Sequence, residues 1–164
     1  MRYAQIRSLD ISNGEGVGIA LYTQGCRFHC KNCFNSELWD YTKGKEWSSE
    51  VEDYLISLLS HDYIDRISFL GGEPLSEENL EDLDNLLNRI RRECPSKKIW
   101  MYTGYTYEAI KDRLSYILKN VDVLVDGLYV DELRDLKLEF RGSSNQRVID
   151  VQNTIKCNEV ITLY

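Results

Sequence analysis

The sequence predicts an α/β fold, an open, partial (β/α) barrel of about four to six mostly parallel strands in a single domain of residues 1–164. Short apolar runs alternate with segments of helical periodicity, the pattern of parallel strands joined by right-handed crossovers. The chain is too short for the eight units of a closed barrel, so one side would stay open. That open side would be free to face a large partner.

Apolar periodicity places each element. Segments with apolar residues three and four positions apart, such as Val51, Tyr54 and Leu55, indicate amphipathic helices. Ser49 and Glu52 match a capping box at the start of the first helix. The strands are expected at residues 17–22, 67–70, 99–102 and 121–125, and the helices from 49, from 76 to the proline at 95, and over 106–119. Beyond residue 141 the pattern weakens, and residues 148–151 and 160–163 are candidates for short strands.

The composition excludes several classes of function. The 20 basic and 27 acidic residues give a formal charge of -7, so the chain lacks the basic surface that nucleic acid requires. No run is long and apolar enough to span a membrane, and the first residues lack the apolar core of a signal peptide. We therefore expect a cytoplasmic protein with neither a membrane nor a nucleic acid as partner.

Three of the five cysteines lie in one short segment, at Cys26, Cys30 and Cys33. Crowded thiols without a secretion signal indicate metal binding in a reducing compartment rather than disulfides. Three thiolates with no evident fourth form an incomplete ligand set. A cluster held by three cysteines leaves one iron open, whereas a structural zinc site is normally closed by a fourth ligand. The other two cysteines, Cys94 and Cys157, are interpreted as packing residues.

A simpler alternative treats the three cysteines as an apolar stripe, because their spacing of four and three residues also fits one face of a helix. Gly25, Asn32 and Asn35 make a poor helix, and charged residues lie within the segment. A loop that holds a metal or a cluster is therefore favoured. His29, which lies between two of the cysteines, is interpreted as a loop side chain rather than a fourth ligand.

Glycine and polar residues follow the other expected strands. The string Gly71-Gly72-Glu73-Pro74 follows the second strand, Thr103-Gly104 the third and Asp126-Gly127 the fourth. Parallel α/β folds place their active sites at the carboxyl ends of the strands, so these residues are candidates for the site. The paired glycines would let backbone approach a ligand closely. The same strings are also ordinary turn sequences, and a proline suits the first turn of a helix.

These motifs together resemble a known family. The C-x3-C-x2-C spacing is similar to that of the radical S-adenosylmethionine enzymes, and Gly71-Gly72-Glu73-Pro74 resembles the second motif of that superfamily. With Asn13-Gly14-Glu15-Gly16 and Arg141-Gly142-Ser143-Ser144-Asn145-Gln146, the chain resembles the activating proteins of the anaerobic (class III) ribonucleoside-triphosphate reductases. The resemblance runs from about residue 10 to residue 151, which is nearly the whole chain.

The resemblance implies a glycyl-radical-activating oxidoreductase. Cys26, Cys30 and Cys33 would hold a 4Fe–4S cluster whose fourth iron is open to S-adenosylmethionine. The partner would be the large subunit of the reductase, and a flavodoxin-type protein would donate the electron. Residues 141–147 would lie near the partner, although a solvated turn also fits them. The superfamily often has an aromatic residue directly before the third cysteine, a position that Asn32 fills here. The residues implied to contact S-adenosylmethionine are Asn32, Cys33, Phe34, Gly71, Gly72, Glu73, Thr103 and Asp126.

Two alternatives remain at this point. The chain could be another small radical S-adenosylmethionine enzyme, such as the activase of a different glycyl radical enzyme, although the pyruvate formate-lyase type is longer. It could instead be a non-catalytic zinc or iron–sulfur module that mediates assembly. The second alternative requires a fourth protein ligand, and none of the available residues has a convincing spacing. Those residues are His29, His61, Cys94 and Cys157.

Overall fold

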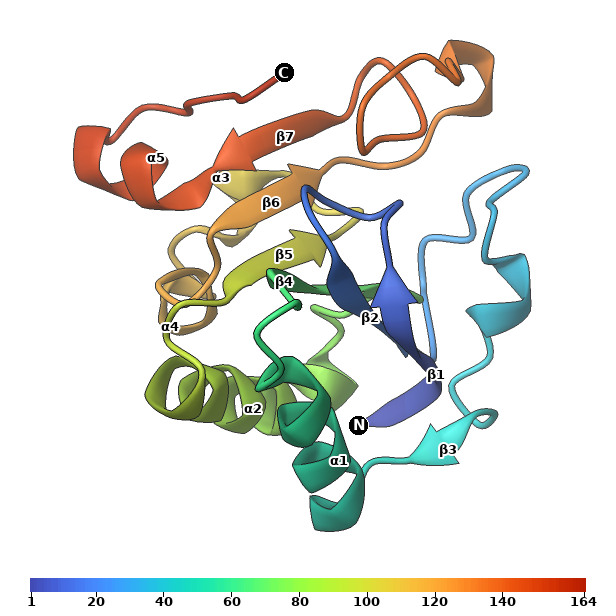
Figure 1. Ribbon diagram of the computed structural model, residues 1–164. Helices are drawn as coiled ribbons and strands as arrows, with labels where there is room; N and C mark the ends of the chain where they lie inside the picture. Colours follow the sequence, from blue (N-terminus) through green and yellow to red (C-terminus); the bar gives the residue numbers. More distant parts are fainter.

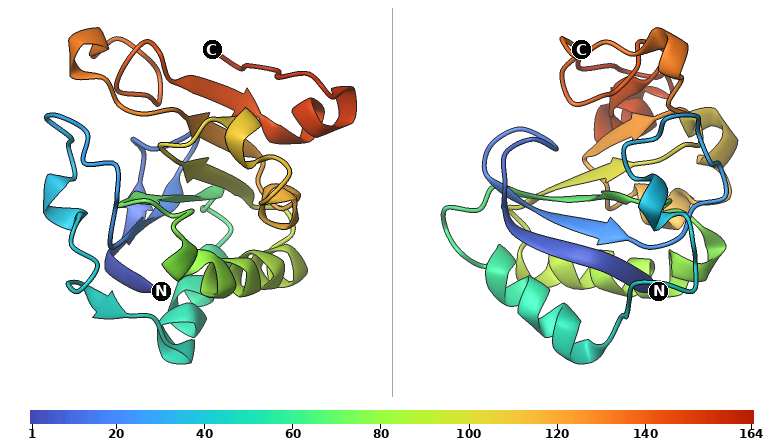
Figure 2. Two further views of the ribbon diagram at one scale, coloured as in Figure 1. Left: turned by 180° about the vertical axis from the view of Figure 1, so that it is seen from behind. Right: turned by 90° about the vertical axis from the view of Figure 1, so that its right-hand side faces the viewer.

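The computed structural model describes residues 1–164 and contains one seven-stranded sheet (Figures 1 and 2). The strands are β1 (Arg2–Asp10), β2 (Gly18–Thr23), β3 (Lys45–Glu46), β4 (Arg66–Gly71), β5 (Lys98–Tyr102), β6 (Val123–Asp126) and β7 (Arg147–Asp150). The helices are α1 (Ser49–Leu59), α2 (Leu80–Glu93), α3 (Tyr107–Ile110), α4 (Ser115–Leu118) and α5 (Val151–Cys157). Short 3-10 turns lie at Ser36–Leu38, Glu77–Asn79 and Asp131–Leu133. No helix combines the length and the apolar character needed to cross a membrane.

The sheet is mixed, with the strand order β3-β1-β2-β4-β5-β6-β7. Its four central strands, β2, β4, β5 and β6, are parallel neighbours, which confirms the four strands predicted from the sequence. The strands β1 and β3 at one edge and β7 at the other pair antiparallel. The sheet therefore has more strands than the four to six expected, and half of its six pairings are antiparallel. The predicted curvature into a partial barrel stays a prediction.

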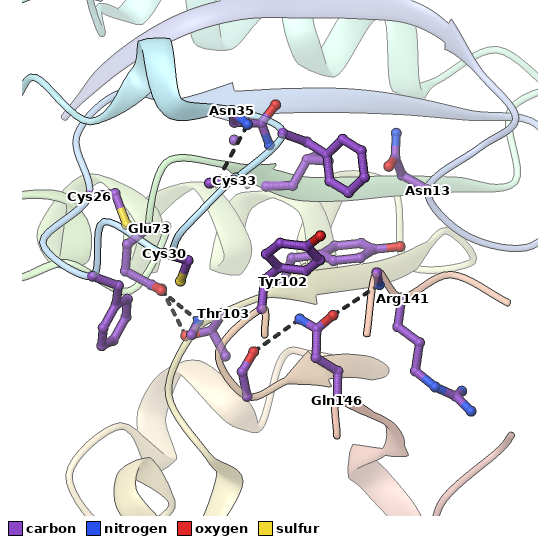
Figure 3. A pocket seen from close by; sticks show the side chains of 18 of the residues that line it. Asn13, Cys26, Cys30, Cys33, Asn35, Glu73, Tyr102, Thr103, Arg141 and Gln146 are labelled. Atoms are coloured by element: carbon purple, nitrogen blue, oxygen red, sulfur yellow. Dashed lines mark hydrogen bonds between the residues drawn. The ribbon is translucent and has the colours of Figure 1, made fainter. Parts of the chain in front are cut away.

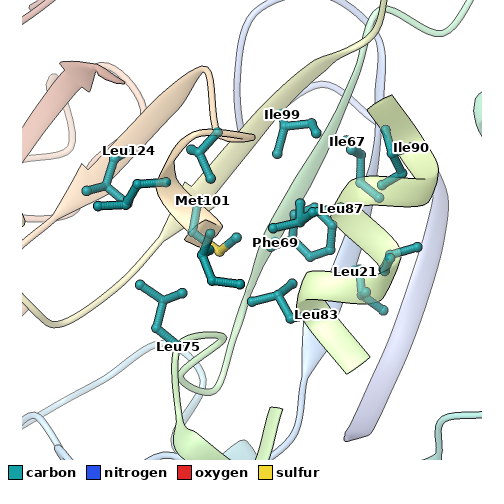
Figure 4. Close-up of a cluster of buried hydrophobic side chains, with 14 of the residues drawn as sticks. Leu21, Ile67, Phe69, Leu75, Leu83, Leu87, Ile90, Ile99, Met101 and Leu124 are labelled. Carbon is teal, nitrogen blue, oxygen red and sulfur yellow. The ribbon is translucent and has the colours of Figure 1, made fainter. Parts of the chain in front are cut away.

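One face of the sheet carries the main hydrophobic core. Alternate strand residues point to this face, including Leu21, Phe69 and Met101, and α2 covers them with Leu83 and Leu87 (Figure 4). All five of these side chains are fully buried. The five helices all contribute buried residues to the same cluster. Helices on one face leave the opposite face of the sheet available for a site.

Helix boundaries differ from the predictions in three places. The first helix is capped by Ser48, whose Oγ accepts a hydrogen bond from the backbone N–H of Val51 at 3.4 Å, so the predicted cap at Ser49 is wrong by one residue. A 3-10 turn delays the start of α2 to Leu80. The single helix predicted over 106–119 is two short helices, α3 and α4. The strand predicted at 160–163 is reduced to one bridge, between Ile149 and Thr162.

The loop between β1 and β2 folds onto the helix-free face and is held there by a buried ion pair. Nη2 of Arg66 donates to Oδ2 of Asp10 at 2.8 Å, and both side chains are almost completely buried. Nε of Arg66 donates to the backbone carbonyl of Glu15 at 3.0 Å. The side-chain amide of Asn13 donates to Oδ1 of Asp10 at 2.7 Å. These contacts fix the loop over the helix-free face, with its base at the amino ends of β2 and β4.

Candidate active site

A cavity of about 460 Å³ lies on the helix-free face, where β2, β4 and β5 end. It is lined by residues of the cysteine loop, the glycine loop after β4 and the loop after β5 (Figure 3). The expected site residues that line it are Cys26, Cys30, Cys33, Phe34, Gly71, Gly72, Glu73 and Thr103. A cavity of this size is typical of a site for one small molecule.

The cysteine loop is fixed at its start by two backbone hydrogen bonds. The N–H of Gly25 donates to the carbonyl of Leu38 at 2.7 Å, and the N–H of Cys26 donates to the carbonyl of Trp39 at 3.1 Å. Within the loop, His29 and Asn32 have φ angles of 49° and 55°, in the left-handed region that few non-glycine residues adopt. The segment is therefore a folded loop, and the alternative of a helical stripe of cysteines is wrong.

The three thiols are partly buried at the wall of the cavity. Burial raises the pKa of Cys26 and of Cys30, so each thiol needs a bound cation to hold it as a thiolate. No three His, Cys, Asp or Glu side chains converge closely enough to hold a single metal ion. In an iron–sulfur cluster each cysteine binds a different iron, so the sulfurs stand apart. The arrangement therefore fits a cluster better than a structural zinc ion.

Trp39 adds a second observation that fits a sulfur-containing group. Its side chain lines the same cavity as the cysteines and stacks on His29, with ring centroids 4.5 Å apart. Its indole N–H is buried and has no hydrogen-bond acceptor in the chain. Buried donors without a partner are rare in folded proteins, and one beside a ligand site indicates that the ligand supplies the acceptor. The sulfur atoms of a cluster are suitable acceptors for this N–H.

The glycine loop packs against the start of the cysteine loop. The N–H of Glu73 donates to the carbonyl of Gly25 at 2.7 Å, and a Cβ atom at Gly72 would lie 2.3 Å from that same oxygen. Gly71 has a φ of 103°, which also requires glycine. The expected reason for the paired glycines was close approach to a ligand. The structure shows a reason within the chain, because the loops after β2 and β4 touch through their backbones.

Glu73 joins the loops after β4 and β5. Its buried carboxylate accepts hydrogen bonds from the hydroxyl of Thr103, the N–H of Gly104 and the N–H of Leu75, at 2.8, 2.8 and 2.9 Å. Burial raises the pKa of Glu73 to about 7 against the opposing effect of these donors. The hydroxyl of Thr103 also accepts from the N–H of Tyr105 at 3.1 Å. Both side chains are engaged within the chain, so they position the surrounding loops.

Two expected site residues do not reach the cavity. Asn32 is exposed, and its side-chain amide donates to Oδ2 of Asp131 at 2.7 Å. Asp126 is buried and accepts hydrogen bonds from the guanidinium of Arg147 and, at 2.7 Å, from the N–H of Tyr107. Its carboxylate thus holds the start of α3 and the edge strand β7. The sequence placed both residues beside the site but could not show which way their side chains turn.

Residues 141–147 form a turn tied to the loop after β6. Oε1 of Gln146 accepts from the N–H of Gly142 at 2.9 Å, and its Nε2 donates to the carbonyl of Gly127 at 3.0 Å. The side-chain amide of Asn145 donates to the carbonyl of Leu128 at 2.8 Å. Gln146 and Arg141 line the cavity. The segment therefore helps to build the wall of the cavity, and most of its polar side chains already have partners.

Several residues of the cavity were not identified from the sequence. Tyr22 and Tyr102 lie on its floor, and Phe28 lines it while packing edge-on against Tyr105, with ring centroids 4.8 Å apart. Asn13, from the motif that precedes β2, also lines the cavity. The position of Tyr102 could have been found from strand alternation, because its neighbour Met101 faces the core.

A mixed α/β fold with three separated cysteines on one cavity defines a candidate iron–sulfur protein. A family model described as a 4Fe-4S single cluster domain matches residues 12–149. The anaerobic ribonucleoside-triphosphate reductase-activating protein of Vibrio cholerae serotype O1 is 39% identical over 148 residues, which are 89% of this chain and 96% of the relative. Proteins of the same name are 39% identical over 150 residues in Escherichia coli K12 (90% of this chain, 97% of the relative) and 38% identical over 148 residues in Enterobacteria phage T4 (90% and 93%). The chain belongs to the family of anaerobic ribonucleoside-triphosphate reductase-activating proteins, which confirms the resemblance seen in the sequence.

Proposed function

We propose that this chain, as one domain of residues 1–164, is a radical S-adenosylmethionine enzyme that installs a glycyl radical on the large subunit of an anaerobic ribonucleoside-triphosphate reductase. The observation that carries the proposal is the set of three cysteines on one cavity beside the glycine loop, with no fourth protein ligand converging on them. The names of the relatives support the choice of partner. The predicted open, partial barrel would leave this face accessible to that partner. The predicted cytoplasmic location would give the cysteines a reducing environment.

Cys26, Cys30 and Cys33 would hold a 4Fe–4S cluster and leave one iron open for S-adenosylmethionine. When bound and reduced, such a cluster supplies one electron with which S-adenosylmethionine is cleaved to methionine and a 5′-deoxyadenosyl radical. A flavodoxin-type protein is the proposed electron donor. The product on the reductase is a glycine residue that has lost one hydrogen atom from its Cα.

The chain's own residues bind and orient the reactants. The backbone of Gly71 and Gly72 lines the cavity beside the cysteines and would contact the amino acid end of S-adenosylmethionine. Glu73 and Thr103 hold that backbone in place through the hydrogen bonds described above. The ring of Phe34 lines the cavity from the cysteine loop and is 60% exposed, so it can cover a bound cofactor. Asn32 and Asp126 are left out of the proposed contacts because their side chains turn elsewhere.

The experiment that tests this proposal is anaerobic reconstitution of the chain with iron and sulfide, followed by measurement of iron content and of 5′-deoxyadenosine formed in the presence of dithionite. Replacing Cys26 by Ala should abolish 5′-deoxyadenosine formation and lower the iron content. Cys157→Ala is the matched control, because this thiol is exposed and lies outside the cavity, and it should behave as the wild type. Full iron content and activity in Cys26→Ala would show that the cluster is held in another way.

A further inference from the structure

The centre of the cavity contains a polar group that nothing in the chain satisfies. Tyr102 ends β5 with its side chain on the helix-free face of the sheet, and it lines the cavity. Its hydroxyl is buried and has no hydrogen-bond partner. Figure 3 shows its ring between Cys30 on one side and Asn13 and Arg141 on the other. A buried hydroxyl without a partner destabilises the free protein, so its presence on the cavity floor indicates that a ligand completes it.

The Asp10–Arg66 ion pair on this face of the sheet is already satisfied within the chain, whereas Nε and Nη1 of Arg141 at the far end of the cavity are buried without a partner. Asp10 and Arg66 form the buried ion pair, and Nη1 of Arg66 also donates to Oγ of Ser68 at 2.7 Å. The side-chain amide of Asn13 donates to Asp10. Burial raises the pKa of Tyr102 well above its ordinary value, so the phenol keeps its proton and acts as a donor. The floor therefore offers one O–H to an acceptor such as the carbonyl of a peptide bond.

The rim of the cavity also suits a peptide. Phe34 and Leu136 line it and are 60% and 79% exposed. Large exposed apolar side chains around a polar floor are typical of a surface that another protein covers. The cofactor is expected at the side of the cysteines and the glycine loop, and Tyr102 lies between that side and the far end formed by Asn13 and Arg141 (Figure 3). A peptide that enters from the far end would therefore meet this hydroxyl before it reaches the cysteines.

We infer that the hydroxyl of Tyr102 donates a hydrogen bond to a backbone carbonyl of the glycine-bearing segment of the reductase and so positions that segment in the cavity. The inference rests on the proposed function for the identity of the partner. It assigns Tyr102 as a positioning residue that acts on the protein substrate. The residue takes no part in binding the cluster.

The test is Tyr102→Phe, which removes the O–H and keeps the ring. Tyr63→Phe is the matched control, because this phenol is exposed and lies outside the cavity. For each variant we would measure the KM for S-adenosylmethionine in 5′-deoxyadenosine formation without the reductase, and the KM for the reductase in glycyl radical formation. Calorimetry of the cluster-free chain with the reductase gives the dissociation constant without any turnover. Iron content and the midpoint of urea unfolding show that each variant is folded.

We expect Tyr102→Phe to raise the KM and the dissociation constant for the reductase about fivefold to tenfold, the scale of one hydrogen bond at a buried site. Its kcat and its KM for S-adenosylmethionine should match those of Tyr63→Phe. Its unfolding midpoint should be higher, because the variant removes a buried hydroxyl that has no partner in the free chain. A raised KM for S-adenosylmethionine with unchanged reductase binding would assign the hydroxyl to the cofactor and overturn the inference. If neither the KM for S-adenosylmethionine nor the binding of the reductase changed, the inference would also be overturned, and the partner of the hydroxyl would be water. Absence of 5′-deoxyadenosine from the wild type would instead refute the proposed function, and it would be seen before any variant is compared.

Discussion

Gly72→Ala tests whether the two loops of the site depend on direct backbone contact. The added Cβ would lie 2.3 Å from the carbonyl oxygen of Gly25, where ordinary contacts begin near 3.4 Å. The loops must therefore separate by about 1 Å, which also stretches the 2.7 Å hydrogen bond from the N–H of Glu73 to the same oxygen. Overpacking of this kind costs about 1–3 kcal/mol, and the weakened hydrogen bond about 1 kcal/mol more.

We expect Gly72→Ala to lower the free energy of unfolding of the cluster-free chain by about 2–4 kcal/mol, measured by urea denaturation. Iron uptake on reconstitution should fall too, because the displaced loop begins at Gly25 and carries Cys26. Gly142→Ala is the control, since its Cβ would have no backbone atom among its nearest contacts. Those contacts are the ring of Tyr129, at 3.1 Å, and Oε1 of Gln146, at 3.6 Å, and both belong to side chains. That variant should change stability by less than about 1 kcal/mol. Equal stability and equal iron uptake in the two variants would refute the steric argument.

Two further predictions concern the network that holds β7 to β6 and α3. Arg147→Met should lower the free energy of unfolding in urea by about 2–4 kcal/mol, because it leaves the buried carboxylate of Asp126, 1% exposed, without its cation. The control Arg141→Met breaks no ion pair and should lower it clearly less. Equal losses in the two variants would show that the ion pair is not the cause. The hydrogen bonds from Arg147 lower the pKa of Glu108 to about 2 from its ordinary 4.5. A carboxylate with a lowered pKa stabilises the fold fully above its unfolded pKa, and this contribution is lost as the pH falls through the folded pKa. Glu108→Gln should therefore lower the free energy of unfolding by about 0.5–1 kcal/mol at pH 7 and by almost nothing near pH 2; the value at pH 7 is kept small because Glu108 is half exposed to solvent. An equal loss at both pH values would show that the charge of Glu108 is not responsible.

The sequence predicted the elements whose burial leaves a clear pattern. The four parallel strands are buried on both faces and read as short apolar runs, and α1 and α2 have apolar residues at helical spacing. The strand β1 was missed because it lies near the edge of the sheet and mixes polar with partly buried residues. Residues 106–119 have a helical pattern of apolar residues, but they form two separate helices of four residues each.

The candidate site was predicted as far as its motifs lie on single loops. The cysteines and the glycine loop carry local signals, and the structure brings both to one cavity. The roles of Asp126 and Tyr102 depend on contacts that only the folded chain creates. Asp126 turns to Arg147, a residue 21 positions away, whereas Tyr102 lacks a partner altogether. The sequence shows which side chains lie near the end of a strand, but it does not show which of them form hydrogen bonds within the folded chain.

In the proposed function, the chain removes a hydrogen atom from a backbone glycine of the reductase. Electron paramagnetic resonance of the reductase, after anaerobic incubation with the reconstituted chain, S-adenosylmethionine and a reductant, tests it directly. A glycine Cα that has lost one hydrogen keeps the other, so we expect a doublet that collapses to a singlet when the reductase is made with Cα-deuterated glycine. Formation of 5′-deoxyadenosine without any organic radical on the reductase, or a radical whose spectrum is unchanged by the deuterium, would contradict the proposed activity.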